Sequence, residues 1–170
     1  MARYNQWMNQ KLYAKVAQLS DEDIAKDRGA FFPSILHTLN HILVGDLLWF
    51  RRFTSSKACK EHLTMMKDMP RPTSLDELLF TNIQALREHR NSMDKLILDF
   101  SHTWSESMLQ SDIRYRDTEG NKHQRSLGVL LHQVCNHQTH HRGQVTALLF
   151  QAGIDPEATD LLVMMMEENR

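Results

Sequence analysis

The segment between Ser126 and Gly153 carries the pattern that most restricts the fold. At intervals of three or four residues its side chains are aliphatic or histidine: Leu130, Val134, His137, His141, Val145 and Leu148. This spacing places them in one stripe on one face of an α-helix. A long helix with one apolar face is typical of a helical bundle, in which that face is buried against neighbouring helices.

Similar periodicity recurs along the chain and predicts an all-α fold. Long helices are expected over residues 2–18, 34–53, 74–100 and 126–153. A short C-terminal helix is expected from Asp155-Pro156 to Met166. Together these segments predict a four-helix bundle with a short fifth helix after it.

Two of the connections between the expected helices have sequence patterns that predict a loop and a hairpin. Residues 54–73 contain two prolines and are expected to form a loop that ends at Ser74, the start of a capping box. In residues 107–126, Ile113 and Tyr115 alternate with charged residues, and Glu119-Gly120-Asn121 is a turn signal. This pattern predicts a small hairpin inserted before the last long helix.

Composition limits the classes of protein to consider. The chain has 170 residues, 41% hydrophobic and 24% charged, which suits one globular domain over residues 1–170. Its 20 basic and 21 acidic residues form no basic run, which argues against nucleic-acid binding. No apolar run approaches the ~20 residues that span a bilayer, and the N-terminus lacks the apolar core of a signal peptide. We therefore expect a cytoplasmic protein without a membrane segment.

Three histidines are the candidate metal ligands. His137 and His141 are four residues apart, so their directions on the helix differ by only ~40° and both can reach one ion. His41 lies on a second mostly apolar stripe, with His37, Val44 and Leu48. Buried imidazoles need partners, because an unpaired buried polar group costs roughly 1–3 kcal/mol. We therefore expect His41, His137 and His141 to hold one divalent ion per chain, Zn, Ni, Fe or Mn, in an open site.

Other residues near this pattern leave alternatives open. The three rings could instead be polar core residues, and His37 could be a fourth ligand, a partner of a ligand, or a helix-start histidine. Asp46 is expected to cap or to pair with Arg3 or Asn5, and Gly143 to allow close helix packing. The remaining histidines are expected at the surface: His62, His89, His102, His123, His132 and His140.

The residue after His137 excludes one well-known metal motif. Zinc proteases of the HExxH type use the glutamate as general base. Here that position is Gln138, which cannot accept a proton as a carboxylate does. A protease of this class is therefore not expected.

Four segments resemble the DinB family of DinB/YfiT-like metalloenzymes. They are residues 2–7, 39–49, 136–144 (NHQTHHRGQ) and 159–162. The resemblance covers nearly the whole chain and implies a four-helix bundle of unusual connection order, a homodimer, and a metal bound by His41, His137 and His141. The N-terminus is shorter than in much of the family, so the natural chain is expected to start further upstream.

The resemblance implies one of two kinds of enzyme. Some relatives resemble thiol-dependent S-transferases, in which a metal activates a small thiol for attack on an electrophile, and others resemble maleylpyruvate isomerases. The alternative is a non-catalytic metal-binding dimer of the stress response. Arg142 and Gln144 follow the last expected ligand and could contact substrate, support a ligand, or clamp two helices together.

Overall fold

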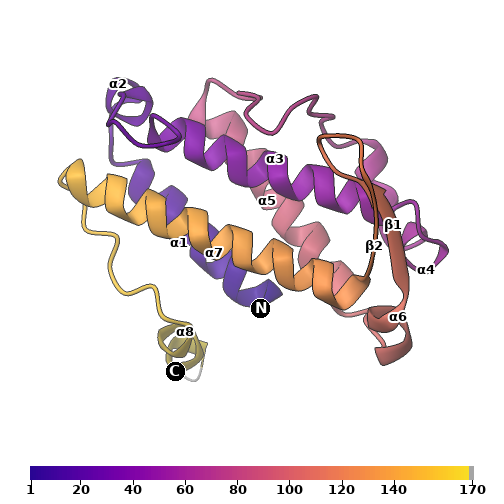
Figure 1. Ribbon diagram of the computed structural model, residues 1–170. Helices are drawn as coiled ribbons and strands as arrows, with labels where there is room; N and C mark the ends of the chain where they lie inside the picture. Colours follow the sequence, from indigo (N-terminus) through magenta and orange to yellow (C-terminus); the bar gives the residue numbers. More distant parts are fainter. Residues whose placement is uncertain (169–170) are drawn as a thin grey trace.

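Four long helices form the body of the protein, and each packs against two of the others. The computed structural model describes residues 1–168. The long helices are α1 (Ala2–Val16), α3 (Ile35–Phe53), α5 (Ile83–Ser101) and α7 (Leu127–Gln151). Both α1 and α3 pack against α5 and α7, so α1 lies diagonally across the bundle from α3 (Figure 1). The expected all-α bundle is confirmed. Its first two long helices lie on one diagonal of the bundle and its last two, α5 and α7, lie on the other.

Shorter elements connect and flank these helices. They are α2 (Asp21–Ala25), α4 (Lys57–Lys60), the 3-10 helix η1 (Thr64–Lys67), α6 (Glu106–Gln110), β1 (Asp112–Arg116), β2 (Lys122–Ser126) and α8 (Leu161–Glu168). The expected hairpin is present: β1 and β2 pair antiparallel, with Tyr115 opposite His123. It lies at one end of the bundle, beside α3 and α7 (Figure 1).

The predicted start of the third long helix was wrong. Helix α5 begins at Ile83, where the side chain of Asn82 accepts hydrogen bonds from the first-turn amides of Gln84 and Ala85. The side chain of Glu77 instead accepts from Thr73 and closes a loop. Within the non-helical residues 74–82, the backbone of Leu75 and of Phe80 forms hydrogen bonds with side chains of α3.

Asn40 holds this loop against α3. Its side-chain amide donates to the carbonyl of Phe80 at 2.9 Å and accepts from the amide of Phe80 at 2.9 Å. Together these two bonds pair both the N–H and the carbonyl of Phe80, as a neighbouring β-strand would. They fix the loop over the middle of α3, close to His41.

The short C-terminal helix is present but begins at Leu161 rather than at Asp155-Pro156. The residues before it run along α1. The hydroxyl of Tyr4 donates to the carbonyl of Thr159 at 2.6 Å, and Lys11 donates to the carbonyl of Ala158 at 2.7 Å. These side-chain bonds use carbonyl groups that a longer helix would have paired internally.

Polar side chains from all four long helices meet inside the bundle. Arg90 on α5 is 1% exposed and lies 2.6 Å from Asp46 on α3 and 3.0 Å from Asp94 one turn further along α5. Gln138 on α7 donates to Asp46 at 2.7 Å. Asn9 on α1 donates to Asp94 at 2.9 Å. The expected pairing of Asp46 with Arg3 or Asn5 is therefore wrong, because Asp46 points to the bundle centre.

Apolar residues fill the bundle on both sides of this polar layer. The most deeply buried large side chains include Phe50, Phe53, Phe100, Leu12, Leu43 and Leu47. Within residues 1–168, no helix has both the length and the apolar character that crossing a bilayer requires.

Replacing Arg90 by methionine tests the polar layer. Arg90→Met leaves two buried carboxylates without their counterion, so the free energy of unfolding should fall by about 3–5 kcal/mol. Urea denaturation measures it. Lys95→Met on the same helix is the control, because Lys95 is 66% exposed and its pair with Asp99 is worth only about 0.3–0.5 kcal/mol. Equal losses for the two variants would contradict the assignment.

Candidate metal centre

Three imidazole rings from two helices converge between α3 and α7. The nitrogen atoms that His41, His137 and His141 can offer to a metal all lie within 4.8 Å of one another. The Nε2 atoms of His41 and His137 are 3.0 Å apart. Two nitrogens that each lie about 2.1 Å from one ion are separated by a similar distance when the nitrogen–ion–nitrogen angle is about 90°. The three histidines can therefore hold a metal ion.

Two of the rings are oriented by hydrogen bonds at their other nitrogen. The Nδ1 atom of His41 lies 2.8 Å from the carbonyl of Leu75, and that of His141 lies 2.7 Å from Oε1 of Gln144. A carbonyl can only accept, so each Nδ1 carries the proton and each Nε2 keeps a lone pair. This is the arrangement that metal-binding histidines adopt.

Burial keeps the rings neutral. Burial first, and then the neighbouring rings of His141 and His41, lower the pKa of His137 to about 3. Burial also lowers the pKa of His41 and of His141. Neutral imidazole is the form that binds metals, so no proton has to be displaced near neutral pH.

Aromatic and glycine residues set the space around the rings. Phe32 stacks on His41 with ring centroids 4.1 Å apart and meets His141 edge-on at 5.5 Å. A Cβ atom built on Gly45 would lie 2.7 Å from Cε1 of His137, so only glycine leaves room for this ring. The expected close approach at Gly143 is wrong, because a Cβ atom there would meet nothing within 4 Å.

A pocket of about 310 Å³ adjoins two of the three rings. It lies between α3, α7, the hairpin and the loop that follows η1, and is lined by His41, Gly45, Trp49, Arg52, Leu75, Tyr115, Asp117, Thr118, His123, Gln133 and His137. A small molecule in this pocket would therefore contact the histidines at one end and the hairpin at the other.

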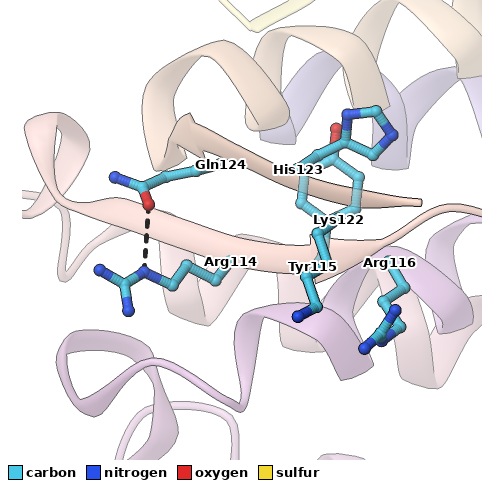
Figure 2. A pocket seen from close by; sticks show the side chains of 6 residues that line it. All are labelled: Arg114, Tyr115, Arg116, Lys122, His123 and Gln124. Atoms are coloured by element: carbon cyan, nitrogen blue, oxygen red, sulfur yellow. Dashed lines mark hydrogen bonds between the residues drawn. The ribbon is translucent and has the colours of Figure 1, made fainter. Parts of the chain in front are cut away.

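The hairpin supplies the far wall of this pocket. Tyr115 and His123 face each other across the two strands and stack with ring centroids 5.3 Å apart (Figure 2). His123 Nε2 lies 2.7 Å from a carboxylate oxygen of Asp117, and this bond is the main cause that lowers the pKa of Asp117 to about 2. Arg114 and Gln124, one position along, bond to each other at 3.0 Å at the exposed surface (Figure 2).

The structure places the other candidate residues as follows. His37 lies at the start of α3, its Nδ1 2.8 Å from the hydroxyl of Ser34, and it is outside the cluster of three. Arg142 is 3% exposed and donates to Gln138 and Asn5, so it clamps two helices. Gln144 supports His141.

Sequence reasoning missed the pocket residues outside the trio. His123 was expected at the surface but is half-buried and lines the pocket. Trp49 and Arg52 could have been predicted from the sequence. Successive spacings of four, four and three residues place His41, Gly45, Trp49 and Arg52 on one stripe of the helix. Nothing local to the hairpin indicates that it folds back against this stripe.

The fold and the three rings together define a helical-bundle protein with a histidine cluster suited to a metal ion. The sequence profile of the DinB family matches residues 1–170, and the chain belongs to this family. Protein DinB of Bacillus subtilis is 28% identical over 162 residues, which cover 92% of this chain and 87% of that protein. A crystal structure of a DinB-like protein from Bacillus cereus is similar in fold, with a TM-score of 0.53, 18% identity and 89% of each chain covered.

Alanine at Gly45 tests the close contact with His137. Gly45→Ala should force the His137 ring aside and cost about 1–3 kcal/mol of overpacking. Gly143→Ala is the matched control, since it adds the same methyl group to the other helix in open space and should gain about 0.5–1 kcal/mol. Urea denaturation and the imidazole NMR signals of His137 report the difference. Equal stabilities with unchanged His137 signals would show that the contact is unimportant.

The buried rings also predict how stability depends on pH without metal. The folded chain holds His137 neutral down to about pH 3, whereas its unfolded value is 6.5. Unfolding therefore takes up protons below pH 6.5, and stability is lost as pH falls from there. In the presence of a chelator, the free energy of unfolding of His137→Gln should fall less steeply with falling pH than that of the wild type. The difference in slope should correspond to about one proton. Denaturation at several pH values measures it, and parallel curves for the two proteins would refute the prediction.

Proposed function

We propose that the protein binds one divalent transition-metal ion per chain through Nε2 of His41, His137 and His141, and is a metal-dependent enzyme. The observation that carries this proposal is the convergence of three neutral rings, two of which already donate their Nδ1 proton elsewhere. Zn, Ni, Fe and Mn all suit an imidazole site with positions left open.

Within this proposal the reaction is transfer of a small thiol to an electrophile. A bound ion would lower the pKa of a thiol that reaches it and so supply a nucleophile near neutral pH. Leu75 and Gln144 hold two rings in place, and Phe32 covers His41. The adjoining pocket offers a place for the second reactant.

His123 lies at the other end of the pocket from the three rings, so it is placed to contact the second reactant rather than a thiol at the metal. Its Nε2 is bonded to Asp117, which leaves Nδ1 as an acceptor. Gln138 cannot serve as a base, because it is fully buried and bonded to Asp46 and Arg142. Since Gln138 is no base and the acidic lining residue Asp117 lies on the hairpin side of the pocket, the site favours transfer over hydrolysis.

The second candidate is a non-catalytic metal-binding dimer of the stress response. Exposed apolar side chains near the C-terminus support a self-associating surface: Phe150 is 72% exposed and Leu162 is 64% exposed. A homodimer in the cytoplasm, with residues 1–170 as one domain, fits either function.

Metal analysis tests the proposed site. Protein purified without a nickel column should contain about one metal ion per chain, and His137→Ala should lower metal affinity roughly 100-fold or more, since even partners of metal ligands are worth 10–100-fold. His132→Ala is the control, because His132 is exposed on the same helix. Full metal content in His137→Ala, or none in the wild type, would refute the site.

Conjugation of thiols to monobromobimane separates the two candidate functions. In this reaction a carbon–sulfur bond forms, bromide leaves, and the thiol proton goes to a base. Wild type should accelerate conjugation of at least one small thiol, and His137→Ala should not. Bound metal without acceleration for any thiol would favour the non-catalytic function.

A further inference from the structure

Arg52 lies at the end of the pocket opposite the three histidines. It shares one face of α3 with His41, Gly45 and Trp49, and all four line the pocket. Seven residues separate Gly45 from Arg52, which is ~10 Å along the helix. Because side chains lean toward the helix N-terminus, the guanidinium can reach back toward the rings.

Two aromatic rings hold the Arg52 side chain. Its Cζ atom lies 4.6 Å from the ring centre of Trp49 and 5.4 Å from that of Tyr115. Trp49 and Tyr115 also meet edge-on, 5.2 Å apart. Such stacking fixes the plane of a guanidinium but uses none of its hydrogen-bond donors.

Those donors have no protein partner. Among residues 1–168, no hydrogen bond or ion pair is formed by the Arg52 side chain, whereas Arg90 and Arg142 are bonded inside the bundle. Asp117 is the acidic residue of the pocket and its charge acts on Arg52, but the two form no hydrogen bond. The oxygens of Asp117 accept instead from His123 and from the turn amides of Glu119 and Asn121. Arg52 is thus a preorganised cation facing a small-molecule pocket.

We propose that Arg52 binds a carboxylate of the small molecule whose reactive end faces the three histidines. This inference rests on the proposed function, because it takes the histidine end as the reactive one. A planar guanidinium with free donors matches a carboxylate in a bidentate pair. The substrate class is therefore an elongated monocarboxylate, carried by either the thiol or the electrophile.

Matched thiols test the proposal by binding rather than by turnover. The zinc-loaded protein is titrated calorimetrically with ω-mercaptohexanoate and with the neutral ω-mercaptohexanol. The acid should bind roughly tenfold more tightly or better, as expected for a hydrogen bond to a charged group. Arg52→Gln should remove this preference, leave the affinity for the alcohol within about twofold, and leave the zinc content unchanged.

Two further variants keep the result interpretable. Arg52→Lys retains the charge without the planar fork and should restore part of the preference. Arg125→Gln makes the same change of charge on the exposed hairpin, outside the pocket, and should behave as wild type. A carboxylate preference that survives Arg52→Gln, or that Arg125→Gln also removes, would overturn the proposal.

A second pair of probes asks which reactant carries the acid. ω-Acrylamidohexanoate and its alcohol bear an electrophile in place of the thiol. A preference confined to the thiols assigns the carboxylate to the thiol, and one confined to the acrylamides assigns it to the electrophile. No preference in either pair overturns the proposal. If metal analysis finds no ion, the acrylamide pair still tests Arg52 on metal-free protein. A failure of the proposed metal site and a failure of the Arg52 proposal are therefore distinguishable.

Discussion

The buried ion pair between Asp46 and Arg90 is the constraint on which the site depends. Both side chains are almost fully removed from water, so either charge without the other would strongly destabilise the fold. The pair therefore fixes α3 against α5. Gln138 extends the pair to α7 through its bond to Asp46. Since Asp46 follows Gly45 and Gln138 follows His137, the same contact that sets the register of the two helices brings the His137 ring over the glycine.

This register gives two neighbouring stripes of α7 different roles. One stripe, with Gln138 and Arg142, faces the centre and clamps the bundle. The adjacent stripe, with His137 and His141, faces α3 at the edge. The histidines therefore lie beside a polar layer, and along their own stripe buried Val134 and Val145 flank them as the spacing predicts. That position gives them access to a pocket while burial keeps them neutral.

Helical periodicity predicted the long helices and the inward faces that carry the three rings, because spacing along a helix fixes which residues share a face. Alternation of residue types with a turn signal predicted the hairpin. The same logic failed where a tertiary contact outweighs a local signal. Glu77 matches a capping box, yet Asn40 holds the backbone of Phe80 and delays the helix until Ile83. Likewise, no local pattern indicates that Leu75 would orient His41, or that His123 would join the pocket.

Every ring of the candidate centre comes from a helix, whereas much of its surroundings comes from connections between helices. Phe32 precedes α3, Leu75 precedes α5, and Tyr115 and His123 precede α7. Such segments can change in length and sequence while the bundle keeps its spacing. A scaffold of this kind permits exchange of specificity by grafting loops, with the coordinating framework left intact.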